Sequence, residues 1–487
     1  MFGDYLFEVA SAEYEKKIIL WDDDHILEND KYLIRFINNK FTIVRYDDDL
    51  VFRKEYGKLL RSDESKLLII ADSTQYIPYD IQSRCFVKDA SVSGLFKGLR
   101  IEFLREHNEA NLDMVVLAFN NSFPSLESNE AIRDFFENTV LGRENIKQYI
   151  SNKNDRLHRR LEDKITYKEW FKIAEIKAEI DKLAAQYRLE IDTTWISEIF
   201  SEWLVNGFGK LSAEINQESP VLVSKAMEFI RDNSDRFVIV VMDGMSEFDW
   251  YVLKTSFAGL NYSKTSIFAM IPTVTSISRQ CLLSNKFPSQ LQDPWSQSKE
   301  KNEFIECAKK IGYKDNQIFY GRGYDNDLKL SIKCAAIIIN DIDDMVHGQH
   351  QDRVGMYNDV KVMVESGELI KMVQRYVQQG LDVYITADHG NTPCVGLGLY
   401  RGAGVETTTR SRRMMVVNSL ADVENLKEKY PLIEYPQYYL NKEQTYLICE
   451  GQASYDSKGD KVMSHGGITI DEVVVPFVKV MARDNNG

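Results

Sequence analysis

The sequence lacks the marks of a secreted or membrane-spanning protein. Its six cysteines lie far apart among 487 residues and form no CxxC pair. Buried thiols are therefore favoured over disulfides or a zinc knuckle. No apolar stretch approaches the roughly 18 to 20 residues that cross a bilayer, and the first residues lack the basic and then apolar order of a signal peptide. We expect a cytoplasmic protein with no membrane segment.

A basic excess is also missing. The chain has 60 Lys and Arg residues against 74 Asp and Glu residues, a net charge of -14. This balance argues against sequence-independent clamping of a nucleic acid backbone, which needs clustered basic residues, but it is compatible with a local basic pocket. A hydrophobic content of 44% predicts a large core shared by two or three domains.

Short apolar runs predict a small α/β domain over residues 1–94. The runs KIIL, FTIV and KLLII, at residues 17–20, 41–44 and 66–70, are expected to be its strands. Acidic turns follow the first two of these strands. Such turns invite comparison with a phosphoacceptor receiver domain, although acidic turns after strands are more often solvated loops.

The sequence of residues 95–232 predicts a mainly helical middle domain. No motif in it indicates a chemical activity. Thr166 and Glu169 form a capping box ahead of a long amphipathic stretch. Ser219 and Pro220 are expected to be the N-cap and first residue of a helix that leads into the next strand.

The third predicted domain, residues 233–487, is organised around the uncharged run FVIVVM and the carboxylate that follows it, Asp243. Similar runs at 266–271, 335–340 and 381–386 alternate with helical stretches, which predicts a doubly wound α/β sheet. Ligands of such sheets bind at the carboxyl ends of the strands. The run VVVPFV is expected to be an edge strand because of Pro476.

Metal-capable side chains follow the run at 335–340. Asp343 and His347 stand four residues apart, a spacing that lets both reach one centre from a single helical turn. Asp341 and Asp344 compete with Asp343 for this role. His350, three residues past His347, is ambiguous.

More such side chains follow the run at 381–386. Asp388 and His389 are adjacent, so they can meet one metal only if the turn is tight, which Gly390 permits. His465 lies in SHGG, ahead of the last predicted strand. Each pair alone is also explained by ordinary hydrogen bonding, but together they indicate a metal centre.

A hydroxyl lies at one strand-to-helix turn of this domain. Thr275 belongs to PTVTS, between the run at 266–271 and the helical stretch ISRQCLL. Backbone N–H groups and the helix dipole favour an anion at such a turn. The threonine can be a nucleophile, or it can simply cap the helix if no metal ligands lie beside it.

The order of these motifs resembles that of the alkaline phosphatase superfamily. The longer runs IPTVTSISRQCLL, ITADHG and SHGGITIDEVVVPFV resemble its PglZ branch, which is found in bacterial antiphage systems and in some response regulators. The first hundred residues resemble antiphage PglZ proteins more loosely, in IILWDDDHILE and LVFRKEYGKLL. The resemblance implies an alkaline phosphatase-type sheet in the C-terminal half and leaves the middle region unassigned.

The resemblance also implies two divalent metal ions. One ion would be held by Asp243, Thr275, Asp388 and His389, and the other by Asp343, His347 and His465. Such Asp, His and Thr ligands suit Zn²⁺, with Mn²⁺ as the alternative. Thr275 is the implied nucleophile because it is the second threonine of PTxT, and Thr273 is the next candidate.

Two groups of basic residues bear on the substrate. Arg279, four residues after Thr275, would share its helix face and pair with a phosphate oxygen. A second cluster comprises Arg401, Arg410, Arg412 and Arg413. It is explained equally well as a solvated loop or as a set of phosphate contacts.

We therefore predict a metal-dependent phosphodiesterase that acts on a nucleotide, an oligonucleotide or a nucleic acid. The resemblance implies a role in antiphage defence, with other defence proteins bound through the first two domains. A phosphomonoesterase with the same ligands, or a non-catalytic metal-binding scaffold that recruits such partners, is the alternative. A phosphomutase is disfavoured because the segment between Thr275 and Asp343 is shorter than a usual domain of about 100 residues.

Overall fold

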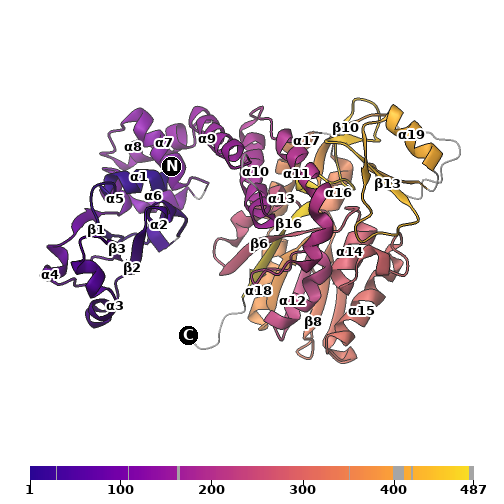
Figure 1. Ribbon diagram of the computed structural model, residues 1–487, viewed down its shortest axis with the longest axis horizontal. Helices are drawn as coiled ribbons and strands as arrows, with labels where there is room; N and C mark the ends of the chain where they lie inside the picture. Colours follow the sequence, from indigo (N-terminus) through magenta and orange to yellow (C-terminus); the bar gives the residue numbers. More distant parts are fainter. Residues whose placement is uncertain are drawn as a thin grey trace. The chain divides into compact units, whose positions relative to one another are not determined.

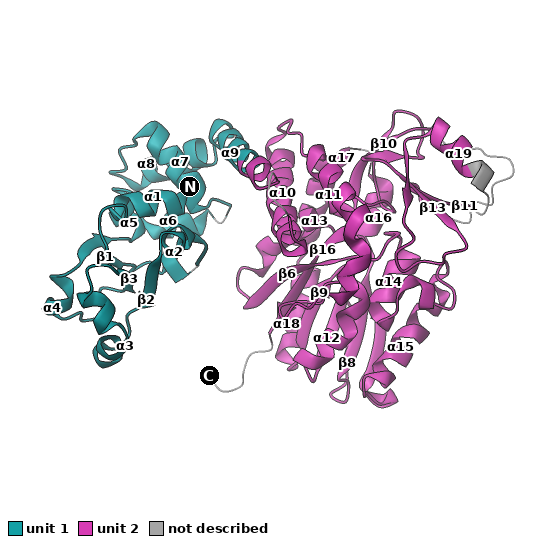
Figure 2. Ribbon diagram, in the orientation of Figure 1, with its two compact units in different colours: residues 1–155 teal, residues 156–487 magenta. Residues whose placement is uncertain are grey.

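The computed structural model describes residues 1–28, 30–107, 109–161, 165–349, 351–398, 411–417 and 420–481. The chain divides into two compact units, residues 1–155 and 156–487 (Figure 2). The boundaries predicted from the sequence, after residues 94 and 232, stay predictions.

The first unit is built on a four-stranded parallel sheet in the order β2-β3-β1-β4 (Figure 1). Its strands are β1 (Lys17–Trp21), β2 (Phe41–Arg45), β3 (Lys66–Ala71) and β4 (Phe86–Asp89). The three strands predicted here are confirmed. Their apolar residues, such as Ile19, Leu67 and Ile69, are fully buried.

Helices surround this sheet and continue beyond it. They are α1 (Phe2–Val9), α2 (Ile34–Asn38), α3 (Asp49–Arg61), α4 (Tyr79–Gln82), α5 (Val92–Leu95), α6 (Ile101–Glu106), α7 (Leu112–Ser122), α8 (Asn129–Asp134) and α9 (Arg143–Leu161). A π-helical turn, Phe135–Val140, separates α8 from α9.

The acidic turn after β1 accepts hydrogen bonds from the backbone of its own and neighbouring loops. Asp22 is 4% exposed and accepts hydrogen bonds from the backbone N–H groups of Ile26 and Leu27. The next two carboxylates reach other loops, since Asp23 accepts from Ser73 N and Asp24 from Val92 N. The solvated-loop interpretation is therefore wrong for Asp22, and these three carboxylates bind backbone amides.

The second unit contains a six-stranded sheet in the order β6-β16-β9-β5-β8-β7. The strands are β5 (Phe237–Met242), β6 (Tyr262–Phe268), β7 (Ile318–Arg322), β8 (Cys334–Ile339), β9 (Asp382–Thr386) and β16 (Val474–Val480). Strands β9, β5, β8 and β7 are parallel, whereas β16 is antiparallel to both of its neighbours. This is the predicted doubly wound α/β architecture.

The prediction of an edge position for the Pro476 strand is wrong, because β16 lies inside the sheet. Pro476 pairs opposite Ser266 of β6, and the ladder to β9 begins one residue later, at Phe477 opposite Thr386. The N–H group that proline lacks therefore falls outside the ladder to β9.

Helices and two small sheets complete the second unit (Figure 1). The helices are α10 (Tyr167–Tyr187), α11 (Thr194–Gly207), α12 (Ala226–Asn233), α13 (Glu247–Leu253), α14 (Thr275–Ser284), α15 (Glu300–Lys310), α16 (Asp341–Gly348), α17 (Asp352–Ser366), α18 (Glu368–Gln378), α19 (Leu420–Lys429) and α20 (Ile470–Val473). The small sheets have the orders β14-β10-β15 and β11-β13-β12. Their strands are β10 (Thr392–Gly396), β11 (Met414–Val417), β12 (Leu432–Tyr435), β13 (Thr445–Cys449), β14 (Ala453–Ser454) and β15 (Lys461–Ser464).

Two predictions made from the sequence concern the residues at which helices begin. The capping box of Thr166 and Glu169 is confirmed at the start of α10. The prediction for Ser219 and Pro220 is wrong, because the next helix α12 begins only at Ala226. Ser219 is fully buried and donates a hydrogen bond to the carbonyl of Ser266. Its hydroxyl therefore links this segment to β6.

Helices α10 and α11 pack against elements of the large sheet. The Phe171 ring of α10 lies 4.8 Å from the Phe268 ring of β6, and Ser201 of α11 donates to the carbonyl of Ile468. Lys177 of α10 is buried and binds both Asp181 and Asp471. Among the described residues, no helix is long and apolar enough to cross a membrane.

Candidate metal centre

Six of the predicted ligands gather at the carboxyl ends of β5, β8 and β9. They form two groups, Asp243 with Asp388 and His389, and Asp343 with His347 and His465. Within each group, the candidate ligand atoms all lie within 4.8 Å of one another. The metal roles of these residues stay predictions, but the structure brings each implied set together.

The first group is almost fully buried. Asp243 is 3% exposed, and Asp388 and His389 are not exposed. Asp388 Oδ1 accepts hydrogen bonds from the N–H groups of Gly244 and His389, which fix the carboxylate. Burial, and next the neighbouring Asp243, raise the pKa of Asp388 well above its ordinary value.

His389 presents one defined nitrogen to this group. Its Nδ1 lies 3.0 Å from the carbonyl of Gly390, so Nδ1 carries the proton and Nε2 carries the lone pair. Nε2 lies 3.8 Å from both Asp243 Oδ1 and Asp388 Oδ2. The imidazole therefore has the tautomer that a metal ligand requires.

The two threonines of PTVT differ in their contacts. Thr275 is the first residue of α14, and its Oγ1 lies 3.0 Å from His389 Nε2. Thr273 is fully buried, donates to the carbonyl of Gly467 and accepts from Gly466 N. The geometry thus puts Thr275 beside the first group, whereas the Thr273 hydroxyl holds the SHGG loop.

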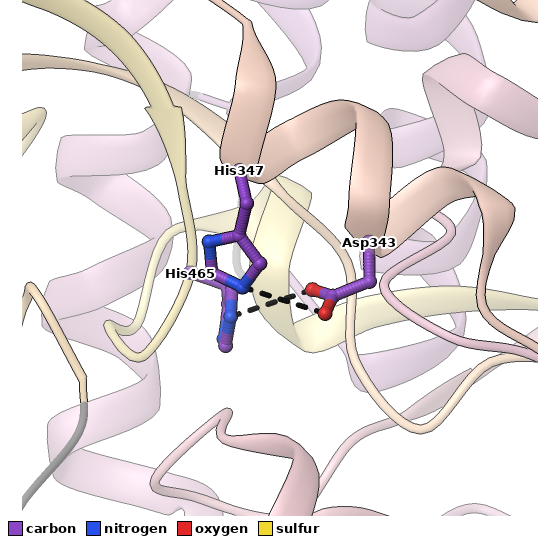
Figure 3. Close-up of side chains that lie close together, drawn as sticks. All are labelled: Asp343, His347 and His465. Carbon is purple, nitrogen blue, oxygen red and sulfur yellow. Dashed lines mark ion pairs between the residues drawn. The ribbon is translucent and has the colours of Figure 1, made fainter.

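The second group lies where α16 faces the loop after β15 (Figure 3). Asp343 Oδ2 is 3.4 Å from His347 Nε2, and Asp343 Oδ1 is 3.6 Å from His465 Nε2. His465 Nδ1 lies 3.0 Å from the carbonyl of Thr273, which again leaves Nε2 with the lone pair.

The environment sets the protonation of the second group. Burial lowers the pKa of His465 to about 4, so this imidazole is neutral at neutral pH. Burial opposes ionisation of Asp343, but the hydrogen bond with His347 and the nearby His465 outweigh it and hold the Asp343 pKa below its ordinary range. The same hydrogen bond with Asp343 raises the pKa of His347.

The competing acidic residues of α16 are placed differently. Asp341 accepts a hydrogen bond from the Tyr324 hydroxyl, and Asp344 is exposed. His350 lies outside the described residues. The arrangement therefore favours Asp343 as the carboxylate of the second group.

The two groups are neighbours. The rings of His389 and His465 stack with their centroids 4.2 Å apart and their planes inclined by 14°. One oxygen of each carboxylate, Asp243 Oδ1, Asp388 Oδ2 and Asp343 Oδ1, is buried without a hydrogen-bond partner in the part of the chain described. Buried charged oxygens need such partners. These atoms, with the imidazole nitrogens, fit divalent cations such as Zn²⁺ or Mn²⁺.

Arg279 is the predicted phosphate contact, and its contacts in the structure are with carboxylates. Its side chain is 1% exposed, Nε lies 2.6 Å from Glu300 Oε2, and Nη1 binds Asp243 Oδ2. A contact between Arg279 and phosphate stays a prediction.

The sequence interpretation missed several supporting residues. Asn391 donates to the carbonyl of Gly244 and to Asp249, and Ser278 donates to the carbonyl of Asp388. Gly390 has no positive φ. A glycine is needed there because the chain at Asp471 approaches closely: a Cβ on residue 390 would lie 2.0 Å from the carbonyl oxygen of Asp471. Asn391 could have been chosen from the sequence, because it is a polar residue directly after the DHG motif.

The basic cluster that follows is only partly described, since Arg401 and Arg410 lie outside the described residues. Arg413 is fully buried and binds Glu472 through Nε at 2.9 Å. Both interpretations of the cluster are therefore wrong for Arg413, which is neither solvated nor open to phosphate. Arg412 is 45% exposed and paired with Asp456.

The fold and the two ligand groups define an alkaline phosphatase-like α/β domain that could hold divalent metals. The chain belongs to the PglZ family: residues 221–480 match the model described as the BREX system PglZ alkaline phosphatase-like domain. A search of curated proteins gave no match.

Solved structures with similar folds share little sequence. Murine ectonucleotide pyrophosphatase/phosphodiesterase 5 in complex with AMP is 12% identical, with a TM-score of 0.38 over 50% of this chain and 87% of that one. The human protein of the same name is 14% identical, with a TM-score of 0.37 over 50% and 87%. Phosphonoacetate hydrolase from Sinorhizobium meliloti is 9% identical, with a TM-score of 0.34 over 52% and 92%.

Proposed function

We propose that this protein is a two-metal phosphodiesterase that cleaves nucleotide, oligonucleotide or nucleic acid phosphodiesters in bacterial antiphage defence. The observation that carries the proposal is the hydroxyl of Thr275, which lies 3.0 Å from His389 Nε2 beside two groups of candidate metal ligands. The family match to an alkaline phosphatase-like domain supports the same class of chemistry.

Thr275 acts as the nucleophile in this proposal. Its oxygen forms a bond to phosphorus while the bond to the leaving alcohol breaks, and water then hydrolyses the phosphothreonine ester. The start of α14 positions the Thr275 hydroxyl and places backbone N–H groups and the positive end of the helix dipole near the anionic phosphate. Two bound divalent cations would acidify the hydroxyl and neutralise charge on the attacking and leaving oxygens.

The buried carboxylates and imidazoles keep the site ready for the cations. Hydrogen bonds from Gly244 N and His389 N fix Asp388, and carbonyls fix the tautomers of His389 and His465. Side chains held in this way need no reorganisation during the reaction. Contacts with other defence proteins through the N-terminal and middle regions are part of the proposal.

The test is hydrolysis by the full chain after its metal content has been measured by elemental analysis. Bis-nitrophenyl phosphate, nitrophenyl phosphate and single-stranded DNA are assayed in parallel, with and without added Zn²⁺ or Mn²⁺. We expect the two diesters to be cleaved faster than the monoester. Cleavage of the monoester alone would establish a phosphomonoesterase, and no cleavage by metal-loaded protein would establish a scaffold.

A further inference from the structure

A buried chain of charges runs from Glu300 through Arg279 to the first ligand group. Arg279 Nε lies 2.6 Å from Glu300 Oε2, Nη1 binds Asp243 Oδ2, and Asp388 Oδ2 is 4.0 Å from Nη1. All four side chains are at most 4% exposed. None of these charges is screened appreciably by water, so their sum matters.

Glu300 is held from its other side as well. It is the first residue of α15, and the Tyr320 hydroxyl of β7 donates to its Oε1. Arg322, whose side chain is 48% exposed, lies 3.5 Å from the same oxygen. The carboxylate is therefore fixed in place beside Arg279.

The charge of the cluster matches one divalent cation. A metal centre requires ionised carboxylates, and three of them against one guanidinium leave two negative charges. Arg279 alone would weaken cation binding by placing a positive charge beside both ligand carboxylates. Glu300 offsets that charge, while the Arg279 contact with Asp243 Oδ2 leaves Oδ1 facing the other ligands.

We propose that Arg279 and Glu300 are a positioning pair that sets the cation affinity of the Asp243, Asp388 and His389 group. The inference rests on the proposed metal centre and assigns both residues a role toward the metal. Arg279 holds Asp243 so that one oxygen faces the cation, and Glu300 supplies the charge that keeps the cluster neutral once a divalent cation is bound.

The test is a Mn²⁺ titration of the chelator-stripped full chain, with free Mn²⁺ counted by electron paramagnetic resonance. The variants are Glu300→Gln, the double variant Arg279→Gln/Glu300→Gln, and the control Glu303→Gln. Glu303 lies on the same helix, is 7% exposed and pairs with Lys286 instead. It therefore reports the loss of a buried carboxylate without a change at the ligand group. Circular dichroism checks folding of each variant.

We expect two bound Mn²⁺ ions in the parent and in Glu303→Gln. Glu300→Gln should weaken one of the two ions about tenfold or more, because a positive charge is left uncompensated. The double variant should recover to within about threefold, because two negative charges remain. If Glu300→Gln does not fold, the double variant carries the test alone, since it removes the Arg279 and Glu300 charges together; binding of one ion about tenfold or more weaker than in the parent would then overturn the proposal.

Three results would overturn the proposal. Glu300→Gln could bind both ions as tightly as the parent, or the double variant could bind as weakly as Glu300→Gln. The parent could also bind no Mn²⁺, which would remove the metal centre itself. Because the readout is metal binding, absence of phosphodiester hydrolysis is a separate outcome that concerns only the proposed reaction.

Discussion

Thr275 and Thr273 illustrate how much a single hydroxyl depends on its contacts. The two residues are separated by one position, yet one lies beside His389 and the other bonds two backbone groups of the SHGG loop. The resemblance implied Thr275, the second threonine of PTxT, as the nucleophile and left Thr273 as the next candidate. The contacts are what favour Thr275 over Thr273 as the proposed nucleophile.

Replacement of the proposed nucleophile should separate catalysis from folding. Thr275→Ala removes the attacking oxygen but spares the other ligands, so we expect a loss of roughly 10³-fold or more in kcat with metal content retained. Thr275→Ser should keep part of the activity. Thr273→Ala should instead lower stability by about 1 to 3 kcal/mol, because buried backbone groups lose a partner. Full hydrolysis by Thr275→Ala in the bis-nitrophenyl phosphate assay would contradict the assignment.

Loss of a predicted ligand should reduce metal content. Asp243→Ala and His389→Ala should each lower the bound metal, measured by elemental analysis, and the melting temperature of the metal-loaded protein, because ligand binding stabilises the folded state. His25→Ala is the control, since this side chain is 58% exposed and distant in sequence from both groups. Unchanged stoichiometry in both ligand variants would show that these residues bind no metal.

Lys254 provides a test of pH dependence away from the metal centre. Burial lowers its pKa to about 8, from an ordinary value of 10.5. Between these values the unfolded chain binds the extra proton, so the contribution of Lys254 to stability should rise with pH, by at most about 1.4 kcal/mol per unit. Lys254→Met should remove this rise.

The measurement for Lys254 is denaturant unfolding at pH 8, 9 and 10, within the range between the two pKa values. As the pH increases, the unfolding free energy of the parent should rise relative to that of Lys254→Met. Lys172→Met, an exposed position on α10, serves as the control. Equal pH slopes in the parent and Lys254→Met would mean that Lys254 is solvated.

Among the elements, α10 bears a buried lysine that connects it to the loop beside the first ligand group. Lys177 binds Asp181 and Asp471, and Asp471 packs against Gly390 of the DHG loop. Lys177→Met removes one of two cations from these carboxylates, because Arg353 also pairs with Asp471 at 3.1 Å, so we expect a loss of about 1 to 3 kcal/mol in unfolding free energy. Lys172→Met on the same helix should change it by less than about 0.5 kcal/mol. Equal effects in denaturant unfolding would contradict this role of Lys177.

The sequence predicted those elements whose residues share one pattern. Strands β5 and β8 were predictable because their apolar runs are continuous, and β9 because all its residues after Asp382 are uncharged. Asp343 and His347 were predictable as a pair because they share one helical turn. The interior position of β16 was not predictable from the sequence, because strand order depends on pairing between distant segments. Glu300 was missed because its partner Arg279 lies 21 residues away on another helix.

For the whole molecule, the division into two units predicts which fragment folds. Residues 156–487 contain both ligand groups together with α10 and α11, so this fragment should unfold cooperatively and bind metal like the full chain. A fragment of residues 233–487 would lack the Phe171 contact with Phe268 and the Lys177 contact with Asp471. We expect it to aggregate or to unfold without cooperativity. Cooperative unfolding of the shorter fragment would instead support the boundary predicted after residue 232.

The interior place of β16 has a consequence for synthesis of the protein. This strand lies between β6 and β9, and His465 enters the second ligand group just ahead of it. A nascent chain that ends before residue 465 therefore has an unfilled gap in its sheet and an incomplete second ligand group. The proposed hydrolysis, which requires both ligand groups, could then begin only after this late segment has left the ribosome, and a prematurely terminated chain would lack it.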